Sequence, residues 1–410
     1  MKTSTNHFSL PLAAALLAGA TLFTPAHAWQ TVYGPLTGGL TGVSGHLGTD
    51  AAGNVYAAGR YLAPDGSSIA IVLGSGDQGN TWALVDEYAE AGRSYAHNRA
   101  FAADQVNGNL FAGGNVNNLL PNGTYEYDTL WFIREWDPQT GTWFTAEDSS
   151  NLINDVGEAS CADLLVTPAG DVFATGGGQQ LGWLVRKRAA GASMFTTVDV
   201  DYSGKSSGAG WGMAFHPTRG LFVVGEVNGR WTVRRSASGD WGTWTTVDSI
   251  SGGARSAVVT ASGAIHVAGW ITNRGKRHWV VRTSTDGGIT WKTTDDVKPA
   301  GDLAEPTGMS EDGAGNILVC GWARDASGKA RWLVRQGTVV TNLVKKGKNW
   351  VEETSLNWTT IEDYSGAADG LIQARANSIA ADPTGNIYVS GVGGDALNNA
   401  FFIVRRLPQP

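Results

Sequence analysis

The chain has 410 residues, with 37 acidic and 30 basic side chains and a formal net charge of −7. Its densest basic stretch is residues 345–348, so nucleic acid is not an expected partner. Beyond the N-terminus, no stretch approaches the roughly 18 apolar residues of a membrane-spanning helix.

Residues 1–28 have the pattern of a signal peptide. Lys2 is followed by the apolar stretch 10–23, and the small residues Ala26 and Ala28 flank His27 before Trp29. The pattern predicts an exported, soluble protein, located in the periplasm or secreted to the medium.

The residues after the predicted cleavage site read as a strand. Residues 29–33 align without gaps on residues 244–248, which belong to an outer strand of the repeat described next. We expect Trp29–Tyr33 to pair with Phe401–Val404 and so complete the last repeat, because this removes an exposed sheet edge.

The rest of the chain repeats a unit of roughly fifty residues seven times. Each unit contains a small-residue strand, a Gly turn, an apolar strand, a Trp-apolar-Val-Arg strand and an outer strand that opens on an aromatic residue. The turns begin at Asp50, Asp104, Thr167, His216, Thr260, Asp312 and Asp382. Four short strands per unit predict an all-β, seven-bladed β-propeller that forms a single domain over residues 29–410.

The third strand carries an arginine at one position in six units. These residues are Arg134, Arg186, Arg234, Arg282, Arg335 and Arg405. A side chain that recurs in six copies is explained by the repeat, so we interpret these arginines as structural.

Two hairpins between third and fourth strands fit Ser-x-Asp-x-Gly-x-Thr-Trp. Their residues are Ser75, Asp77, Gly79 and Trp82, and Ser284, Asp286, Gly288 and Trp291. This motif resembles the Asp-box, or BNR, hairpin of sialidase-like propellers, and the repeat resembles the SBBP type of bacterial β-propeller. The resemblance implies a structural role for both aspartates, away from the ligand-binding mouth. It does not carry over sialidase chemistry, because the Phe/Tyr-Arg-Ile-Pro segment is absent and sialidases have six blades.

Residues that depart from the repeat are the candidates for function. Five positions before each turn stand Gly45, Arg99, Ala162, Trp211, Arg255, Thr307 and Asn377. Seven positions before it stand Val43, His97, Ser160, Ala209, Gly253, Glu305 and Arg375. Both sets are expected near one mouth of the central channel. Loops between second and third strands should add Arg60, Tyr125, Tyr127, Trp270, Arg274, Trp322 and Arg324 there.

From these sets we predict a ligand site at the channel mouth. Its residues are Arg99, Trp211, Arg255, Trp270, Glu305, Trp322, Arg375 and Asn377. Aromatic faces beside Arg and Asn suit a sugar, and arginines with few carboxylates nearby favour an anionic one. The alternative is an ordinary polar rim with core tryptophans.

Tyr95, His97 and Arg99 alternate along one strand, so their side chains should point the same way. These residue types could neutralise a uronate and transfer a proton in a lyase, which makes them the candidate catalytic residues.

Four further features of the chain lie outside these sets. A hairpin insertion is expected near residues 336–357, and a long loop over 115–129. Cys161 and Cys320 belong to distant units, so we expect two separate buried thiols. The seven histidines are scattered, and we expect no metal and no cofactor.

The function that follows is an exported β-propeller, expected to be a monomer, that binds a glycan or an extracellular protein at the channel mouth. The alternative is a carbohydrate-active enzyme, a sialidase-like glycoside hydrolase or a polysaccharide lyase, using the same mouth.

Overall fold

The computed structural model describes residues 28–118, 129–148, 159–177, 183–201, 208–346 and 349–409. Residues 1–27 of the predicted signal peptide, and Tyr125 and Tyr127, lie outside these ranges. The described chain is all β apart from two short 3-10 turns, η1 (Pro35–Thr37) and η3 (Ala367–Asp369).

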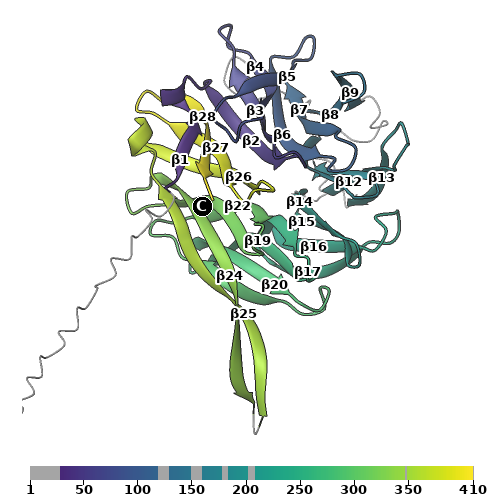
Figure 1. Cartoon of the computed structure of the whole chain (residues 1–410), viewed down its shortest axis with the longest axis vertical. Coiled ribbons are helices and arrows are strands. Elements are labelled where there is room, and N and C mark those ends of the chain that lie inside the picture. Colours follow the sequence, from purple (N-terminus) through teal and green to yellow (C-terminus); the bar gives the residue numbers. More distant parts are fainter. Residues whose placement is uncertain are drawn as a thin grey trace, which may run out of the picture.

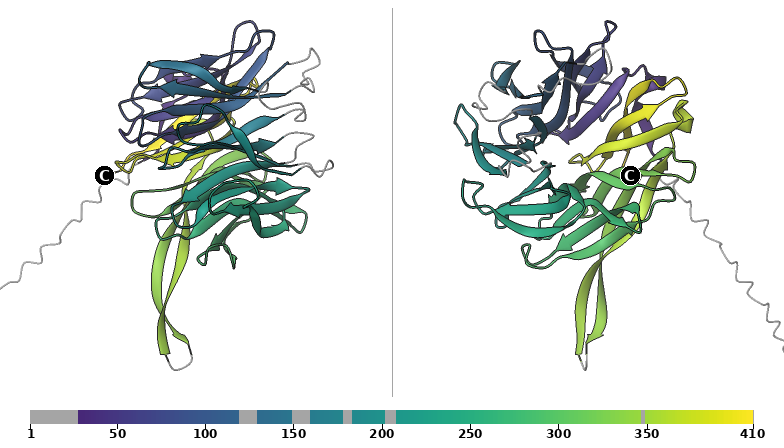
Figure 2. Two further views of the ribbon diagram at one scale, coloured as in Figure 1. Left: turned by 90° about the vertical axis from the view of Figure 1, so that its right-hand side faces the viewer. Right: turned by 180° about the vertical axis from the view of Figure 1, so that it is seen from behind.

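The strands form seven blades around a central axis (Figures 1 and 2), which confirms the predicted architecture. Blade 1 contains β2 (Gly42–Thr49), β3 (Val55–Leu62), β4 (Ser68–Ser75) and β5 (Ala83–Tyr88). Blade 2 contains β6 (Tyr95–Ala103), β7 (Leu110–Asn117), β8 (Leu130–Asp137) and β9 (Thr142–Asp148). Blade 3 contains β10 (Ser160–Val166), β11 (Val172–Gly177), β12 (Trp183–Arg188) and β13 (Thr196–Asp201).

Blade 4 contains β14 (Gly208–His216), β15 (Gly220–Val227), β16 (Arg230–Ser236) and β17 (Thr245–Ser251). Blade 5 contains β18 (Gly253–Val259), β19 (Ile265–Asn273), β20 (Lys276–Ser284) and β21 (Lys292–Val297). Blade 6 contains β22 (Ala304–Glu311), β23 (Ile317–Arg324), β24 (Ala330–Lys346) and β25 (Asn349–Tyr364). Blade 7 contains β26 (Gln373–Ala381), β27 (Ile387–Gly394), β28 (Ala400–Leu407) and β1 (Gln30–Tyr33). Blades 1 and 2 are linked into one sheet by a single bridge between Ser68 and Tyr95.

The N-terminal strand closes the ring as its outermost strand, as expected, but the expected register is wrong. β1 pairs antiparallel with β28 through Gln30 with Arg406 and Tyr33 with Val404. Phe401 instead bridges Thr41, on the far side of the η1 turn. The strands run antiparallel, and β1 has an irregularity between Thr31 and Tyr33. The first residue of β1, Gln30, therefore pairs with Arg406, which lies C-terminal to the expected range.

The fully buried tryptophans at the start of the third strands fill the space between blades. They are Trp131, Trp183, Trp231, Trp279 and Trp332. Glycines within the second strands lie against these rings, so that a Cβ added at Gly391 would come 2.8 Å from the Trp332 ring. A glycine at this position therefore permits close blade packing.

The six repeated arginines of the third strands each form an ion pair with a carboxylate on the outer strand of the preceding blade. The pairs are Arg134–Asp86, Arg186–Glu147, Arg234–Asp199, Arg282–Asp248, Arg335–Asp295 and Arg405–Glu362. We call these contacts the seam pairs. They account for the arginine of the repeat without any ligand.

The seventh seam, between blades 7 and 1, replaces both charges. Leu73 pairs with Ala57 and so occupies the third-strand position at which the other blades have the seam arginine. Tyr33 pairs with Val404 and so occupies the outer-strand position at which the other blades have the carboxylate. Both side chains pack in one apolar cluster. The closing seam is therefore hydrophobic, and neither partner leaves a buried charge alone.

The two turns with the pattern Ser-x-Asp-x-Gly-x-Thr-Trp are held by their own side chains. Asp77 accepts from the Thr81 backbone N–H at 2.8 Å, and Asp286 accepts from the Thr290 backbone N–H at 2.9 Å. Hydrogen bonds from Thr290 lower the pKa of Asp286 to about 2. The indoles of Trp82 and Trp291 donate to the carbonyls of Gly79 and Gly288. These aspartates are thus fully engaged in local structure.

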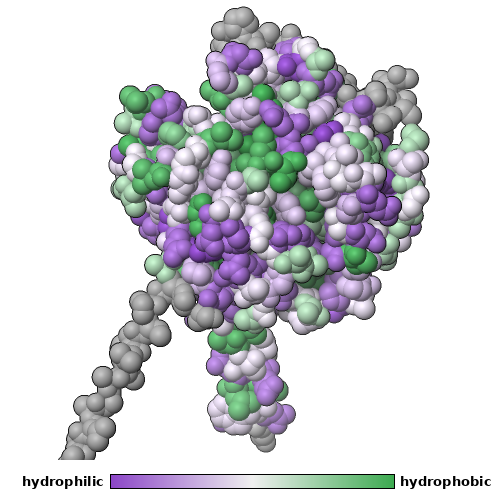
Figure 3. Space-filling model, turned by 45° about the horizontal axis from the view of Figure 1, so that its top comes forward, coloured by the Kyte–Doolittle hydropathy of each residue, from purple (hydrophilic) through white to green (hydrophobic). Residues whose placement is uncertain are grey.

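The insertion near 336–357 is a hairpin. It continues β24 and β25 outward, with pairing from Trp332–Tyr364 to Lys346–Asn349. The resulting arm, residues 338–346 and 349–357, projects from the ring (Figures 1 and 2). Val339, Leu343 and Trp350 are exposed on it, and Figure 3 shows hydrophobic surface on this arm.

Cys161 and Cys320 are both buried and unbridged, as expected. Among the described residues, no helix has the length and apolar character needed to cross a membrane.

Candidate functional site

The central channel contains a cavity of about 410 Å³ that the innermost strands of all seven blades line. Each of these strands has a β-bulge at the same position. The bulged residues are Gly45, Arg99, Ala162, Trp211, Arg255, Thr307 and Asn377. A bulge leaves one residue outside the ladder and redirects its side chain. All seven bulged residues line the cavity.

The residues two positions earlier in these strands behave differently. Val43 and His97 line the cavity, whereas Ser160, Ala209, Gly253, Glu305 and Arg375 are not among its lining residues. Trp270 and Trp322 belong to β19 and β23 rather than to loops. The residues predicted at the mouth therefore fall into two groups. One group lines the cavity, and the other forms stacked side chains around blades 5 to 7.

Trp211 and Arg255 form one wall of the cavity. The Arg255 guanidinium lies 5.2 Å from the centre of the Trp211 ring, and the Trp211 side chain stays 38% exposed. Arg255 Nε donates to Glu305 Oε1 at 2.9 Å. The indole is thus held against a guanidinium that an ion pair keeps in place.

Glu305 corrects one premise of the sequence reading, namely that the mouth arginines have few carboxylates nearby. Its second oxygen accepts from Arg277 at 3.0 Å, and Arg255 also lies 3.6 Å from Glu226. Arg277 in turn stacks on Trp270 at 4.0 Å. The carboxylates come from neighbouring blades, which is why the spacing along the chain did not reveal them.

Arg375 lies over the Trp322 ring at 4.2 Å. Burial, together with Arg324, lowers the pKa of Arg375 from its ordinary value. Arg324 pairs with Asp302 at 3.1 Å, whereas Arg375 has no ion pair among the described residues. This stack therefore offers a guanidinium without a fixed acidic partner.

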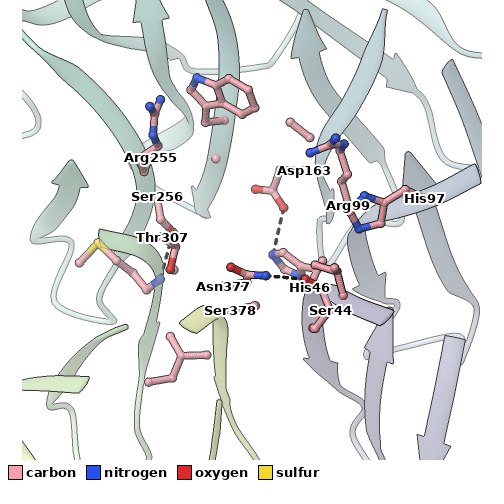
Figure 4. Close-up of a pocket in the computed structure, with 18 residues that line it drawn as sticks. Ser44, His46, His97, Arg99, Asp163, Arg255, Ser256, Thr307, Asn377 and Ser378 are labelled. Atoms are coloured by element: carbon pink, nitrogen blue, oxygen red, sulfur yellow. Dashed lines mark hydrogen bonds and ion pairs between the residues drawn. The ribbon is translucent and has the colours of Figure 1, made fainter. Parts of the chain in front are cut away.

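On the opposite side of the cavity, Arg99 and His97 lie next to each other (Figure 4). Arg99 Nε donates to Asn115 Oδ1 at 2.9 Å, and the Tyr95 hydroxyl lies 3.2 Å from His97 Nδ1. Burial, with Arg99 and Arg60 nearby, holds the pKa of His97 well below its ordinary value. The three candidate catalytic residues are therefore brought together around a neutral imidazole.

Asn377 has a structural task at the cavity. Its Nδ2 donates to the Ser44 carbonyl at 2.6 Å, which links blade 7 to blade 1. Its amide oxygen and the second hydrogen of Nδ2 then remain available to a ligand.

The sequence reading missed His46 and Asp163, which lie between the two walls in Figure 4. His46 Nε2 is 3.5 Å from Asp163 Oδ1. Burial lowers the pKa of His46 to about 4 and raises that of Asp163 to about 7. At neutral pH the channel therefore holds a neutral imidazole beside a carboxyl group that is only partly ionised.

His46 and Asp163 each stand one position after the bulged residue of their strand, and the sequence at this position could have revealed them. Asp163, Ser256 and Ser378 each accept a backbone N–H from the next blade, at Met213, Met309 and Leu47. His46 and Asp163 break this small-residue pattern, so the repeat comparison would have found them there. Within the described ranges, no three His, Cys, Asp or Glu side chains gather as metal ligands.

Solved structures show the same kind of fold. Sqt1 from Chaetomium thermophilum is 12% identical over 93% of this chain and 100% of that chain, with a TM-score of 0.52. A PL25 ulvan lyase is 11% identical over 89% and 94%, with a TM-score of 0.50. The Trypanosoma rangeli sialidase bound to the inhibitor DANA is 11% identical over 90% and 54%, with a TM-score of 0.45.

No protein-family model and no curated protein matches the sequence. Identities this low show the fold alone, because unrelated functions share propeller scaffolds. The comparisons therefore establish that the chain is similar to β-propellers, some of which act on glycans.

Proposed function

We propose that this chain is an exported β-propeller that binds a saccharide, preferentially an acidic one, at the mouth of its central channel. The observation that carries the proposal is Trp211, a bulged residue that presents a 38% exposed indole to a polar cavity. An aromatic face beside directional donors suits the C–H face and hydroxyls of a sugar ring.

The wall around Trp211 supports this role. Arg255 is fixed by Glu305 at 2.9 Å, so it supports the indole without being free to move. Such preorganisation lowers the entropy cost of binding. Asn377, Thr307 and Arg99 add polar groups from other blades to the same cavity.

The proposal includes export and a place among Asp-box propellers. Export is supported by the signal-peptide pattern of residues 1–28, and the Asp-box assignment by the turns at Asp77 and Asp286.

The test is a glycan array with the purified chain, followed by titration of the strongest binders. Trp211→Ala should weaken binding at least about tenfold, because a buried aromatic contact is lost. Trp241→Ala is the matched control, since Trp241 is an exposed indole of the same blade outside the cavity lining. Equal affinity of the two variants, or binding of proteins but of no glycan, would overturn the proposal.

A second candidate, a carbohydrate-active enzyme, is favoured by one observation. The His46–Asp163 contact and the Tyr95–His97 contact place proton-transfer groups in and beside the cavity. Assays for new reducing ends and for unsaturated, ultraviolet-absorbing products on array-positive glycans test it. Turnover that is lost in Asp163→Asn, in protein of unchanged melting temperature, would favour the enzyme.

A further inference from the structure

Arg99 has an anchored position but unused donors. Its Nε is tied to Asn115 Oδ1 at 2.9 Å, and the same oxygen accepts from Ser160 at 3.2 Å. No hydrogen bond from its two terminal nitrogens occurs within the described residues, and the side chain is exposed in the cavity. A guanidinium held in this way presents two parallel N–H donors, which match an oxyanion.

His97 adds a donor that lacks an acceptor. The residue is 7% exposed, and its Nε2 has no hydrogen-bond partner in the described structure. We assign the Tyr95 hydroxyl, 3.2 Å from Nδ1, as the donor of this contact, and this assignment leaves the proton of the neutral ring on Nε2. A buried donor without an acceptor is costly, so an acceptor supplied by a ligand would stabilise it.

Arg60 contributes a second cation from blade 1. It donates to Ser68 Oγ at 2.6 Å and lies over the Tyr95 ring at 5.2 Å, while its Nε is buried without a partner. Both Arg60 and Arg99 are close enough to disfavour protonation of His97. Across the described chain, neither guanidinium forms an ion pair with a carboxylate.

Arg255 provides the contrast within the same ring. It occupies the bulge position of blade 5, as Arg99 does in blade 2, but Glu305 and Glu226 neutralise it. Arg375, also without an ion pair among the described residues, does not line the cavity. Among the arginines that do, the unpaired positive charge therefore lies on the side of blade 2, at Arg99. An anionic group should bind there rather than at the Trp211 wall.

We propose that Arg99, His97 and Arg60 form the subsite for the anionic group, a carboxylate or a sulfate ester, of an acidic saccharide whose ring contacts Trp211. The inference rests on the proposed function and specifies the ligand class of that same site. The oxyanion accepts from the terminal nitrogens of Arg99 and from His97 Nε2, and Arg60 adds long-range attraction.

The first experiment is calorimetric titration of the purified chain with three probes: an oligomer of glucuronic acid, the same oligomer after carboxyl reduction, and a sulfated glucose oligomer. Arg99→Gln should weaken binding of the charged ligand about tenfold or more, because charge-assisted hydrogen bonds are lost. It should leave the carboxyl-reduced oligomer within about twofold. Arg331→Gln is the charge-matched control, since Arg331 pairs with Asp363 outside the cavity.

The second experiment needs no saccharide. Sodium acetate and sodium sulfate are titrated into chain with 15N-labelled histidine, and the ring signals of His97 are followed. We expect a saturable shift of Nε2 that Arg99→Gln abolishes and Arg331→Gln preserves. The salt that shifts it at the lower concentration distinguishes carboxylate from sulfate.

The two experiments separate the two proposals. Trp211-dependent binding with equal affinity for charged and reduced oligomers, without a saturable His97 shift, would overturn the anion subsite and leave the saccharide function standing. A saturable shift in a protein that binds no saccharide would support the subsite and reject the saccharide function. Equal losses for both oligomers in Arg99→Gln would show a general disturbance and also overturn the subsite.

Discussion

Arginines serve opposite purposes in the seams and at the channel mouth. Each seam arginine recurs with the repeat and lies against a carboxylate of the neighbouring blade, as Arg282 does with Asp248 at 2.8 Å. Arg99 stands at a position where only blade 5 also has an arginine, has only an amide partner within the described ranges, and opens into the cavity. The difference teaches that the partner, rather than the residue type, separates a structural arginine from a candidate ligand-binding one.

The largest expected effect lies in the seams. Arg282→Leu leaves the Asp248 side chain, 7% exposed, without its guanidinium, and should lower the free energy of unfolding by about 3–5 kcal/mol. Adding Asp248→Tyr copies the Leu73 and Tyr33 arrangement of the closing seam and should recover part of the loss. Urea unfolding of both variants measures this. A double variant no more stable than Arg282→Leu would contradict the comparison of the seams.

A smaller, pH-dependent effect is expected in the channel, where Asp163 lacks the guanidinium of a seam carboxylate. With a folded-state pKa of about 7 instead of 3.8, its contribution to stability is full below pH 4 and is lost as the pH rises to 7. His46, with a pKa of about 4 instead of 6.5, contributes fully above pH 6.5 and loses that contribution as the pH falls to 4. The two effects oppose each other in the wild-type chain.

Single variants should separate them. Relative to the wild type, Asp163→Asn should lose stability on acidification from pH 7 to 4, by on the order of 3 kcal/mol, and His46→Gln should gain it. Unfolding free energies at several pH values across this window measure both slopes. Parallel profiles for all three proteins would show that neither group has a shifted pKa.

The smallest effect on stability should come from the mouth. Arg99→Gln removes an exposed guanidinium with no buried acidic partner, so unfolding should change by no more than about 0.5 kcal/mol. Thermal unfolding beside Arg282→Leu makes the comparison direct. A loss for Arg99→Gln as large as that for the seam variant would mean that Arg99 is structural as well.

Much of the fold could be predicted because the same sequence pattern occurs in every blade. The seven turns, the closing strand and the structural interpretation of Asp77 each follow from local patterns that recur with the blades. The register of β1 was not readable, because the η1 turn and an irregular pair displace it. A hairpin was expected near residues 336–357, but its continuity with the third and fourth strands of blade 6 was not, since alternation alone does not show that a strand continues.

The candidate site divides in the same way. The departures from the repeat at Arg99, Trp211 and Arg255 pointed to the cavity, whereas His46 and Asp163 escaped because the comparison stopped at two positions of the strand. By itself, the sequence determined the blade count, the ring closure and the bulged residues that face the channel, because these depend on local patterns repeated in register. Only the tertiary structure decided that Glu305 neutralises Arg255 while Arg99 keeps its charge. The Arg255–Glu305 pair joins two blades, and Arg99 meets only the Asn115 amide among the described residues, so no repeated local pattern records either contact.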